Sequence, residues 1–312
     1  MKFVFLGVPR FASIILENLI QAGFTPDLII TTPDKPVGRK HIITPPPVKL
    51  AAQSHGIAMR QPKNKRELKE IIAELNPDLA IVAAYGRLIP KEILEIPKLG
   101  FLNVHPSILP RWRGAAPIQY TILNGDSDTG VTIIKMDEII DHGPILAVDY
   151  FKVDNPKIDY PELEEKLANL GAGLLAKTIS PWIDGKITPI PQNDSQATYT
   201  DIIEKGFGRI DWAKPAEEID RQVRAYTPWP GTFTLIDSAK ILKIYKATIL
   251  AKTNVGPFGE PGKTYLASDD RIAVSCGKDF LIIEELQLEG GKKMAAKDFL
   301  LGHPDFIGIT LT

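Results

Sequence analysis

The 312-residue sequence contains a single cysteine, Cys276, and this scarcity limits its chemistry. One cysteine excludes an intrachain disulfide framework and a zinc site built from cysteine ligands. The chain also lacks a large charge of either sign, because 37 lysine and arginine residues are balanced by 38 aspartate and glutamate residues. The sequence therefore has no global basic signature of a nucleic-acid-binding protein, and any contact to RNA must use a local basic patch.

Long apolar runs are also absent. No stretch reaches the length that spans a bilayer, and the chain starts directly in MKFVFLG, with no basic segment followed by an apolar leader. We therefore expect a cytoplasmic protein without membrane contact. We also expect a monomer. The hydrophobic fraction of 44% and the charged fraction of 24% are typical of a globular chain, for which this length favours two domains.

The N-terminal part predicts an α/β fold with a doubly wound, mostly parallel sheet of the Rossmann-like kind. Residues 2–6 and 27–31 are typical of short apolar strands, and residues 79–86 of a strand that is buried on both faces. Amphipathic patterns indicate helices over residues 47–54 and 65–75. The turn after the first strand lacks G-x-G-x-x-G, so a dinucleotide site is not indicated.

The composition changes at residue 184, where a polar stretch with prolines and no clear period begins. We interpret residues 185–206 as a linker between a catalytic domain, residues 1–184, and a C-terminal domain, residues 207–312. The C-terminal part alternates short apolar-polar runs with turns, which predicts a small OB-like β-barrel. Its expected strands cover residues 232–236, 240–250, 262–267, 272–276 and 281–288.

Residues 101–145, FLNVHPSILPRWRGAAPIQYTILNGDSDTGVTIIKMDEIIDHGPI, carry the groups with the most chemical potential. A strand over residues 101–104 places Asn103 and His105 on one face, because strand side chains alternate. A second strand leads to a turn that carries Asp141. An amide can hold an oxyanion, and a histidine beside a carboxylate can move protons near neutral pH. No serine or cysteine with an adjacent base is evident, so the pattern favours direct transfer of an acyl group to an amine.

Each of these features also has a structural alternative. An Asn-x-His pair on a strand is more often a hydrogen-bonded strand end than an active site, and Asp141-His142-Gly143 is by default a turn in which the glycine supplies a positive φ. His105, Asp141 and His142 could instead be zinc ligands, since a zinc site usually has three ligands from the protein. The residues alone leave these alternatives open.

The string NVHPSILPRWRGAAPIQ, followed by GVTIIKMDEIIDHGPIL, resembles the formyltransferase family that uses 10-formyltetrahydrofolate. RWRGAAPIQ, RIDW, the PWP element and GGKKMAAKDFL resemble in particular the methionyl-tRNA formyltransferases, so the resemblance covers essentially the whole chain. It implies transfer of a formyl group from 10-formyltetrahydrofolate to the α-amino group of methionine on initiator tRNA, in translation initiation. The resemblance implies no metal.

The resemblance also implies roles for individual residues. Asn103, His105 and Asp141 would be catalytic. Apolar and loop positions would bind the folate: Leu88, Ile89, Ser107, Ile108, Leu109, Pro110 and Ile140. Basic residues of a long Pro-rich loop and of the barrel would contact the tRNA: Lys35, Arg39, Lys40, Lys240 and Lys243. Without the resemblance, Leu88 and Ile89 are as typical of core packing, and the basic loop is as typical of a solvated surface. Each barrel lysine is more typical of a solvated surface.

The chain departs from the family pattern at Arg10, where an acidic residue is common, at Ile139, where glycine is common, and at His142, where threonine is common. Three other functions share parts of the pattern. A sugar-nucleotide N-formyltransferase has the same catalytic elements, and a folate-dependent dehydrogenase would need a further nucleotide-binding domain. A non-enzymatic tRNA-binding module would leave Asn103, His105 and Asp141 without a purpose, so replacing Asn103 by alanine separates enzyme from binder.

Overall fold

The computed structural model describes residues 1–38, 41–237, 239–250, 259–267 and 270–312, and the chain divides into two compact units. Unit 1 comprises Met1–Pro117, Ser127–Asp154 and Leu163–Asp201, and unit 2 comprises Ile118–Asp126, Asn155–Glu162 and Ile202–Thr312. Two segments that precede Leu163 in the sequence therefore belong to the second unit. The predicted domain ranges, 1–184, 185–206 and 207–312, treat each part as continuous and stay a prediction.

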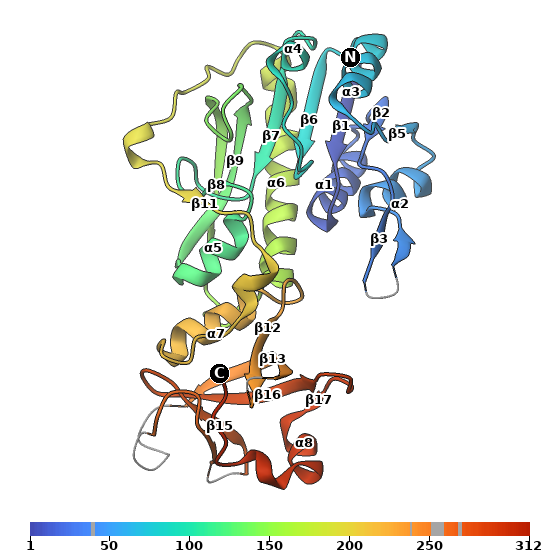
Figure 1. Cartoon of the computed structure of the whole chain (residues 1–312). Coiled ribbons are helices and arrows are strands. Elements are labelled where there is room, and N and C mark those ends of the chain that lie inside the picture. Colours follow the sequence, from blue (N-terminus) through green and yellow to red (C-terminus); the bar gives the residue numbers. More distant parts are fainter. Residues whose placement is uncertain (39–40, 238, 251–258, 268–269) are drawn as a thin grey trace. The chain divides into compact units, whose positions relative to one another are not determined.

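Unit 1 is built on a seven-stranded sheet in the order β10-β9-β7-β6-β1-β2-β5 (Figure 1). Its strands are β1 (Phe3–Gly7), β2 (Leu28–Ile30), β5 (Met59–Arg60), β6 (Leu79–Ala83), β7 (Phe101–His105), β9 (Asp128–Lys135) and β10 (Ile145–Lys152). The strands from β5 to β7 are parallel, whereas β9 and β10 are antiparallel to their neighbours. The predicted mostly parallel sheet of an α/β fold is confirmed.

Helices of unit 1 cover the sheet because their apolar faces need burial: α1 (Arg10–Gln21), α2 (Pro47–Ser54), α3 (Lys65–Leu75), α4 (Lys91–Leu94) and α6 (Tyr160–Ile183), which belongs to this unit from Leu163 onward. Helix α5 (Pro117–Asn124) belongs to unit 2 from Ile118 onward. The start of α3 has a local cause, since the side chain of Asn64 accepts a hydrogen bond from the Glu67 N–H at 2.9 Å. It ends at Asn76, which adopts the left-handed conformation. Among the described helices, none combines the length and apolar character needed to cross a bilayer.

The long Pro-rich loop contains a hairpin of β3 (Lys35–Val37) and β4 (Ile42–Thr44). Its base is fixed by Asp34, which accepts hydrogen bonds from Lys49 Nζ and from the Gln61 amide, each at 2.8 Å. Hydrogen bonds from Lys49 and then Gln61 lower the pKa of Asp34. The sequence predicted a long Pro-rich loop here, so the hairpin is an addition to that prediction.

Unit 2 contains a six-stranded antiparallel sheet in the order β12-β13-β16-β15-β14, with β17 paired to β16. Its elements are η2 (Lys205–Gly208), α7 (Ala216–Ala225), β12 (Thr232–Ile236), β13 (Lys240–Leu250), β14 (Thr264–Leu266), β15 (Ile272–Ser275), β16 (Phe280–Leu288), β17 (Met294–Ala295), α8 (Ala296–Gly302) and η4 (Pro304–Phe306). Buried aliphatic residues of α7 and of the sheet, including Ile219, Leu242 and Val274, form one core. An antiparallel sheet domain at this position agrees with the predicted OB-like fold class.

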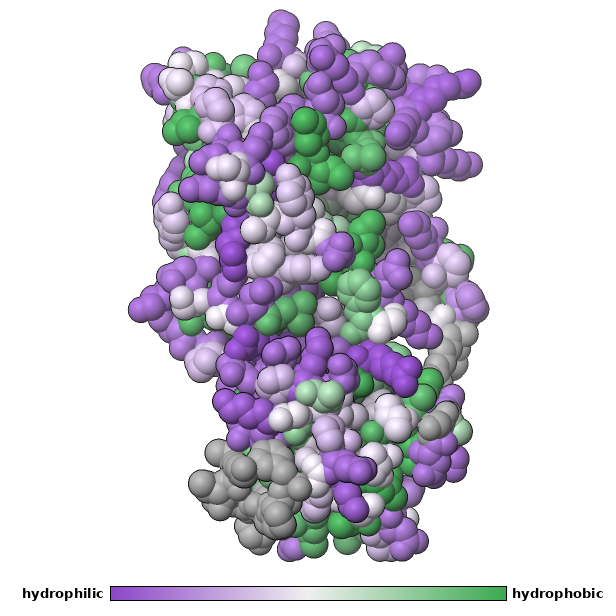
Figure 2. All heavy atoms as spheres, turned by 60° about the vertical axis from the view of Figure 1, so that its left-hand side comes forward, coloured by the Kyte–Doolittle hydropathy of each residue, from purple (hydrophilic) through white to green (hydrophobic). Residues whose placement is uncertain are grey.

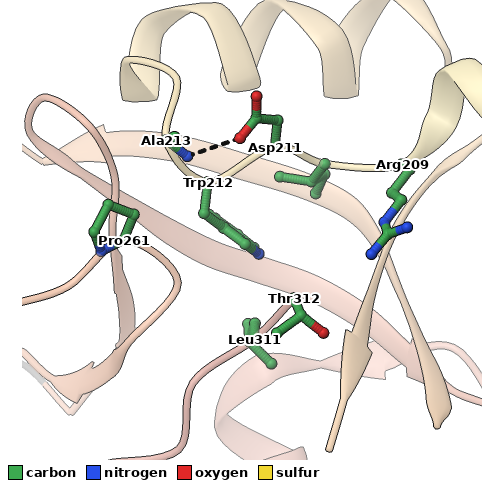
Figure 3. A pocket seen from close by; sticks show the side chains of 8 residues that line it. Arg209, Asp211, Trp212, Ala213, Pro261, Leu311 and Thr312 are labelled. Carbon is green, nitrogen blue, oxygen red and sulfur yellow. Dashed lines mark hydrogen bonds between the residues drawn. The ribbon is translucent and has the colours of Figure 1, made fainter. Parts of the chain in front are cut away.

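The last residues of unit 2 connect the two ends of its sheet. Leu235 and Thr312 exchange backbone hydrogen bonds of 2.8 and 3.0 Å at one end, and the Leu311 N–H donates to the Gly262 carbonyl at 2.9 Å at the other. A pocket of about 480 Å³ lies where this tail meets the loop before α7 (Figure 3). It is lined by Arg209, Ile210, Asp211, Trp212, Ala213, Pro261, Leu311 and Thr312. The pocket is part of unit 2 and contains none of the predicted site residues.

Candidate active site

The three predicted catalytic residues lie together in unit 1. Strand β7 lies between β6 and β9, and β9 leads into the turn that carries Asp141. The Asn103 amide donates to Asp141 Oδ1 at 3.2 Å, and His105 Nδ1 lies 3.5 Å from the same oxygen. Asn103 and His105 therefore lie on one side of β7, as the strand alternation predicted, and share one carboxylate.

Asp141 is held in an unusual backbone conformation, with φ of 50°. Its second carboxylate oxygen accepts a hydrogen bond from the Gly114 N–H at 2.8 Å. The expectation that Gly143 supplies the positive φ of this turn is wrong, because Asp141 has that role. Gly143 is required for a different reason, since a side chain at this position would collide with the Lys135 carbonyl oxygen.

His105 is 3% exposed, and both of its ring nitrogens have a partner. Nδ1 faces Asp141, and Nε2 lies 2.9 Å from the Trp112 carbonyl oxygen. Burial alone would lower the pKa of His105, but the charge and hydrogen bonding of Asp141 outweigh it, and the pKa is raised. Burial alone would raise the pKa of Asp141, but His105, the Gly114 N–H and the Arg113 charge lower it. Each group therefore favours the charged form of the other, an imidazolium beside a carboxylate.

The segment after β7 folds tightly against β9. The Thr132 hydroxyl donates to the Ser107 carbonyl at 2.7 Å and accepts from the Leu109 N–H at 3.1 Å. Trp112 has φ of 60°, which is uncommon for a bulky side chain, and this conformation directs its carbonyl to His105. Of the predicted folate-binding segment, Ser107 and Leu109 are buried, whereas the other two positions are partly accessible.

The remaining predicted folate positions differ in exposure. Ile89 is buried in the core, but Leu88 is 60% exposed and Ile140 is 55% exposed. Lys91 Nζ lies 3.9 Å from Glu138 Oε1, so the segment that follows Leu88 lies beside the turn that carries Ile140. On the face drawn in Figure 2, hydrophobic side chains form small groups between hydrophilic ones.

Three residues whose side chains form a hydrogen-bonded network beside the site were not assigned from the sequence: Arg113, Gln192 and Asp194. Arg113 is 1% exposed, and its guanidinium donates to Gln192 Oε1 at 2.8 and 3.0 Å and to Asp194 Oδ1 at 2.8 Å. The Gln192 amide in turn donates to the carbonyl oxygens of Asp141 and Gly143, each at 2.8 Å. A signal was present for Arg113, because an arginine within the motif RWRGAAPIQ is unusual beside apolar residues unless it has buried partners.

His142 does not join His105. Its Nδ1 lies 2.6 Å from Asp137 Oδ2 and its Nε2 lies 3.5 Å from Asp194 Oδ2. The hydrogen bond that His142 donates to the Asp137 carboxylate raises the pKa of His142. Within the part of the chain that the structure describes, no group of three or more His, Cys, Asp or Glu side chains could hold a metal ion.

The predicted tRNA-contacting residues are divided between the units. Lys35 is exposed on β3, whereas Arg39 and Lys40 lie outside the described residues. In unit 2, Lys240 is exposed and Lys243 is half-buried, both on β13. Other barrel lysines have acidic partners: Lys246 lies 3.2 Å from Glu284, and Lys293 pairs with Glu285.

Comparison with known proteins decides the family. The family described as Formyl transferase matches residues 1–179, and its C-terminal domain family matches residues 202–304. The chain is 41% identical over 305 residues to the methionyl-tRNA formyltransferase of Citrifermentans bemidjiense, covering 97% of this chain and 94% of that protein. It is 42% identical over 307 residues to that of Caldanaerobacter subterraneus subsp. tengcongensis, covering 97% of each. The chain belongs to the methionyl-tRNA formyltransferase family. The resemblance stated from the motifs is confirmed.

Two solved structures with a similar fold illustrate the architecture. An N-formyltransferase from Helicobacter canadensis, in complex with folinic acid and dTDP-3-aminofucose, has a TM-score of 0.62 and 23% identity, covering 94% of this chain and 100% of that one. HypX from Aquifex aeolicus, in complex with tetrahydrofolic acid, has a TM-score of 0.64 and 17% identity, covering 96% of this chain. The chain spans 47% of HypX. At these identities the likeness concerns the fold alone.

Proposed function

We propose that the chain transfers the formyl group of 10-formyltetrahydrofolate to the α-amino group of methionyl-initiator tRNA, for translation initiation. The observation that supports this most is the buried pair of His105 and Asp141, with Asn103 on the same carboxylate oxygen. It occurs in a chain that aligns over nearly its whole length with methionyl-tRNA formyltransferases. The folate is the cosubstrate, and no step of the proposed reaction requires a metal.

The reaction begins when the neutral amine attacks the formyl carbon, and the carbonyl electron pair moves to oxygen. The tetrahedral intermediate carries O⁻, and it collapses when the bond to the folate nitrogen breaks. Asn103 has two amide N–H groups, of which one is used by Asp141. We assign the second to the oxyanion, because a fixed donor stabilises charge that develops in the transition state.

His105 contributes mainly through its charge. Its Nδ1 and Nε2 are occupied by Asp141 and the Trp112 carbonyl, so direct donation to the oxyanion requires Nε2–H to exchange Trp112 for the substrate. Asp141 keeps the imidazole protonated, and catalytic hydrogen bonds in a free enzyme are often longer than in the complex. In this scheme the pair also relays the proton of the attacking amine to the leaving folate nitrogen.

The predicted binding residues complete the proposal. The folate ring packs against the exposed side chains of Leu88 and Ile140, which leave apolar surface accessible. The segment that supports the site includes the remaining predicted positions: Ile89, Ser107, Ile108, Leu109 and Pro110. Lys35, Arg39 and Lys40 would contact the tRNA from the hairpin loop, and Lys240 and Lys243 from unit 2.

The proposed substrate also determines the surroundings of the enzyme. Charged initiator tRNA is used in the cytoplasm, so we infer a cytoplasmic protein that needs no membrane contact. We further infer a monomer. Sedimentation equilibrium at micromolar concentration tests this, because a mass that rises with concentration would contradict it.

An assay with two acceptors tests the function. The purified protein is given 10-formyltetrahydrofolate with methionyl-initiator tRNA and, separately, with an amino-sugar nucleotide. We expect formylmethionyl-tRNA from the wild type and loss of the product in His105→Ala with an unchanged circular-dichroism spectrum. Formylation of the sugar alone would retain the chemistry and refute the tRNA substrate. Transfer to neither acceptor would refute the enzyme and favour a tRNA-binding module.

A further inference from the structure

The polar segment that follows α6 is a structural part of the site. Within it, η1 (Asp194–Gln196) precedes β11 (Tyr199–Thr200), which pairs in parallel with β8 (Arg113–Gly114). The Thr198 carbonyl accepts from the Arg113 N–H, and the Thr198 hydroxyl accepts from the Trp112 N–H, both at 2.9 Å. All of these residues belong to unit 1. This segment therefore fixes the backbone that contacts the catalytic pair.

Gln192 has the most direct connection to the pair. Both of its amide N–H groups are used, one by the Asp141 carbonyl and one by the Gly143 carbonyl. Its side-chain oxygen accepts two hydrogen bonds from Arg113. A side-chain amide with all these partners satisfied has a fixed orientation, and it fixes the backbone to which it donates.

Hydrogen bonds connect residues 112–114 and Gln192 in a ring around the pair of His105 and Asp141. The Trp112 carbonyl contacts His105, and the Gly114 N–H contacts Asp141, so the residues on both sides of Arg113 touch the pair. The Arg113 side chain returns to Gln192, which holds the backbone of Asp141. Since Asp141 has a positive φ, its turn depends on such contacts to keep the carboxylate in place.

We propose that Gln192 is a positioning residue for formyl transfer: it holds the turn of Asp141 so that the carboxylate stays against His105 and Asn103. The inference rests on the proposed function. Gln192 touches no reacting atom and acts only through the position of Asp141. A displacement of about 1 Å at a catalytic group costs on the order of a hundredfold in rate, so two hydrogen bonds to this turn matter for catalysis.

The charged groups around the pair make the effect measurable. Asp141 faces His105 directly, and Arg113 is the next charge, beside Asp141. His142, with Asp137 and Asp194, lies on the outer side of the same turn. If the Asp141 carboxylate moves away from His105, it offsets less of the lowering of the His105 pKa by burial. The imidazole then loses its proton at a lower pH.

Gln192→Glu tests the proposal, because the new carboxylate keeps the acceptor for Arg113 but has no N–H for the Asp141 and Gly143 carbonyls. Gln196→Glu is the matched control: it makes the same chemical change on an exposed residue of the same segment. We expect kcat to fall about tenfold to a hundredfold in Gln192→Glu, with the KM for methionyl-tRNA within about twofold of wild type. The descending limb of the pH–rate profile should move to lower pH. Gln196→Glu should match the wild type.

A second measurement does not depend on the reaction. Nuclear magnetic resonance of protein labelled with ¹³C-histidine reports the titration of His105, identified by its loss in His105→Ala. We expect His105 to titrate at lower pH in Gln192→Glu than in the wild type or the control. If Gln192→Glu does not fold, Gln192→Asn replaces it, because its shorter side chain keeps the amide but cannot reach both carbonyls and Arg113.

The outcomes are separable. Unchanged kcat and unchanged titration of His105 in a folded Gln192 variant would overturn the proposal. A wild-type protein without formyl transfer would refute the proposed function, whereas the titration of His105 would still show whether Gln192 positions the pair. A loss of rate with unchanged KM and a shifted titration would support both.

Discussion

One carboxylate organises the polar centre of unit 1. Asp141 Oδ1 contacts both Asn103 and His105, and Oδ2 accepts from the Gly114 backbone. A buried carboxylate is unfavourable unless it is paired and hydrogen-bonded, and here each oxygen has such a partner. The charges of Asp141 and His105 therefore compensate each other, beside the position that we propose for the oxyanion.

Asn103→Ala should abolish most of the activity, because it removes the donor that we assign to the oxyanion. We expect the single-turnover rate of formylation to fall about a hundredfold to a thousandfold. Asn124→Ala is the control, since the Asn124 amide donates to a backbone carbonyl of its own helix. A rate in Asn103→Ala within about twofold of the control would contradict the assignment, because one oxyanion donor is worth far more.

Activity should depend on pH in a direction set by the pair. The pKa of His105 is raised, so the charged form persists above the usual value near 6.5 and is lost as the pH rises through the raised pKa. Asp141→Asn removes the charge that offsets burial, and the pKa of His105 should then fall below its usual value. The descending limb of the pH–kcat profile should therefore move to lower pH in this variant. A descending limb at the wild-type pH would show that a group other than His105 titrates there.

At the scale of elements, the helices with local signals were predicted from the sequence. Helix α2 has the predicted bounds, and proline at its first position favours a helix start there. Helix α3 also has the predicted bounds, which agrees with its Asn64 cap. The β3–β4 hairpin was not predicted, because its prolines suppress the strand signal and its pairing depends on the fixed base at Asp34.

The alternation along β7 predicted the positions of Asn103 and His105, and the family motifs predicted Asp141. The sequence did not predict the contribution of Gln192, because its partners lie 49 and 51 positions earlier in the chain. A side chain that bonds to distant backbone leaves no periodic pattern in its own neighbourhood. Polar composition there indicated a linker, whereas the structure uses part of that segment to build the site.

Asp34→Ala should loosen the base of the β3–β4 hairpin without touching the catalytic pair. Lys49 and Gln61 lose their shared acceptor, so the hairpin that carries Lys35 is less well fixed. We expect the KM for methionyl-tRNA to rise several-fold, while kcat at saturating tRNA stays at the wild-type value. Asp154→Ala, which changes an exposed aspartate paired with Lys152, should leave both constants unchanged. A fall in kcat with unchanged KM would contradict a binding role for the hairpin.

At the scale of the molecule, unit 2 is assembled from segments that are far apart in the sequence. Asp220 on α7 is 2% exposed, lies 3.2 Å from Lys157 and 3.0 Å from Arg224, and the Arg224 guanidinium also donates to the Ile158 carbonyl. These contacts tie residues 155–162 to α7 within the unit. Composition shifts along a sequence locate linkers, but they do not reveal that an earlier segment is built into a later unit.

Arg224→Ala should destabilise the protein, because it removes a partner of a buried carboxylate and a donor to Ile158. We expect the free energy of unfolding in urea to fall by about 3 kcal/mol. Lys157→Ala is the matched control on the same carboxylate: its side chain is 49% exposed, and its loss should cost at most about 1 kcal/mol. Equal losses of unfolding free energy in the two variants would show that the buried contact of Arg224 with Asp220 stabilises the protein no more than the exposed contact of Lys157 with Asp220.

The tail of unit 2 has a consequence for the behaviour of the protein at high concentration. Residues 310 and 311 bridge to β12 on one side and to Lys263, beside β14, on the other, and the backbone of Thr312 bonds to Leu235. Until the tail is in place, the unpaired N–H and C=O groups of both margins can recruit a strand from another molecule. Pairing of the tail thus also protects both margins against aggregation, and variants that weaken the tail should precipitate before they lose catalysis.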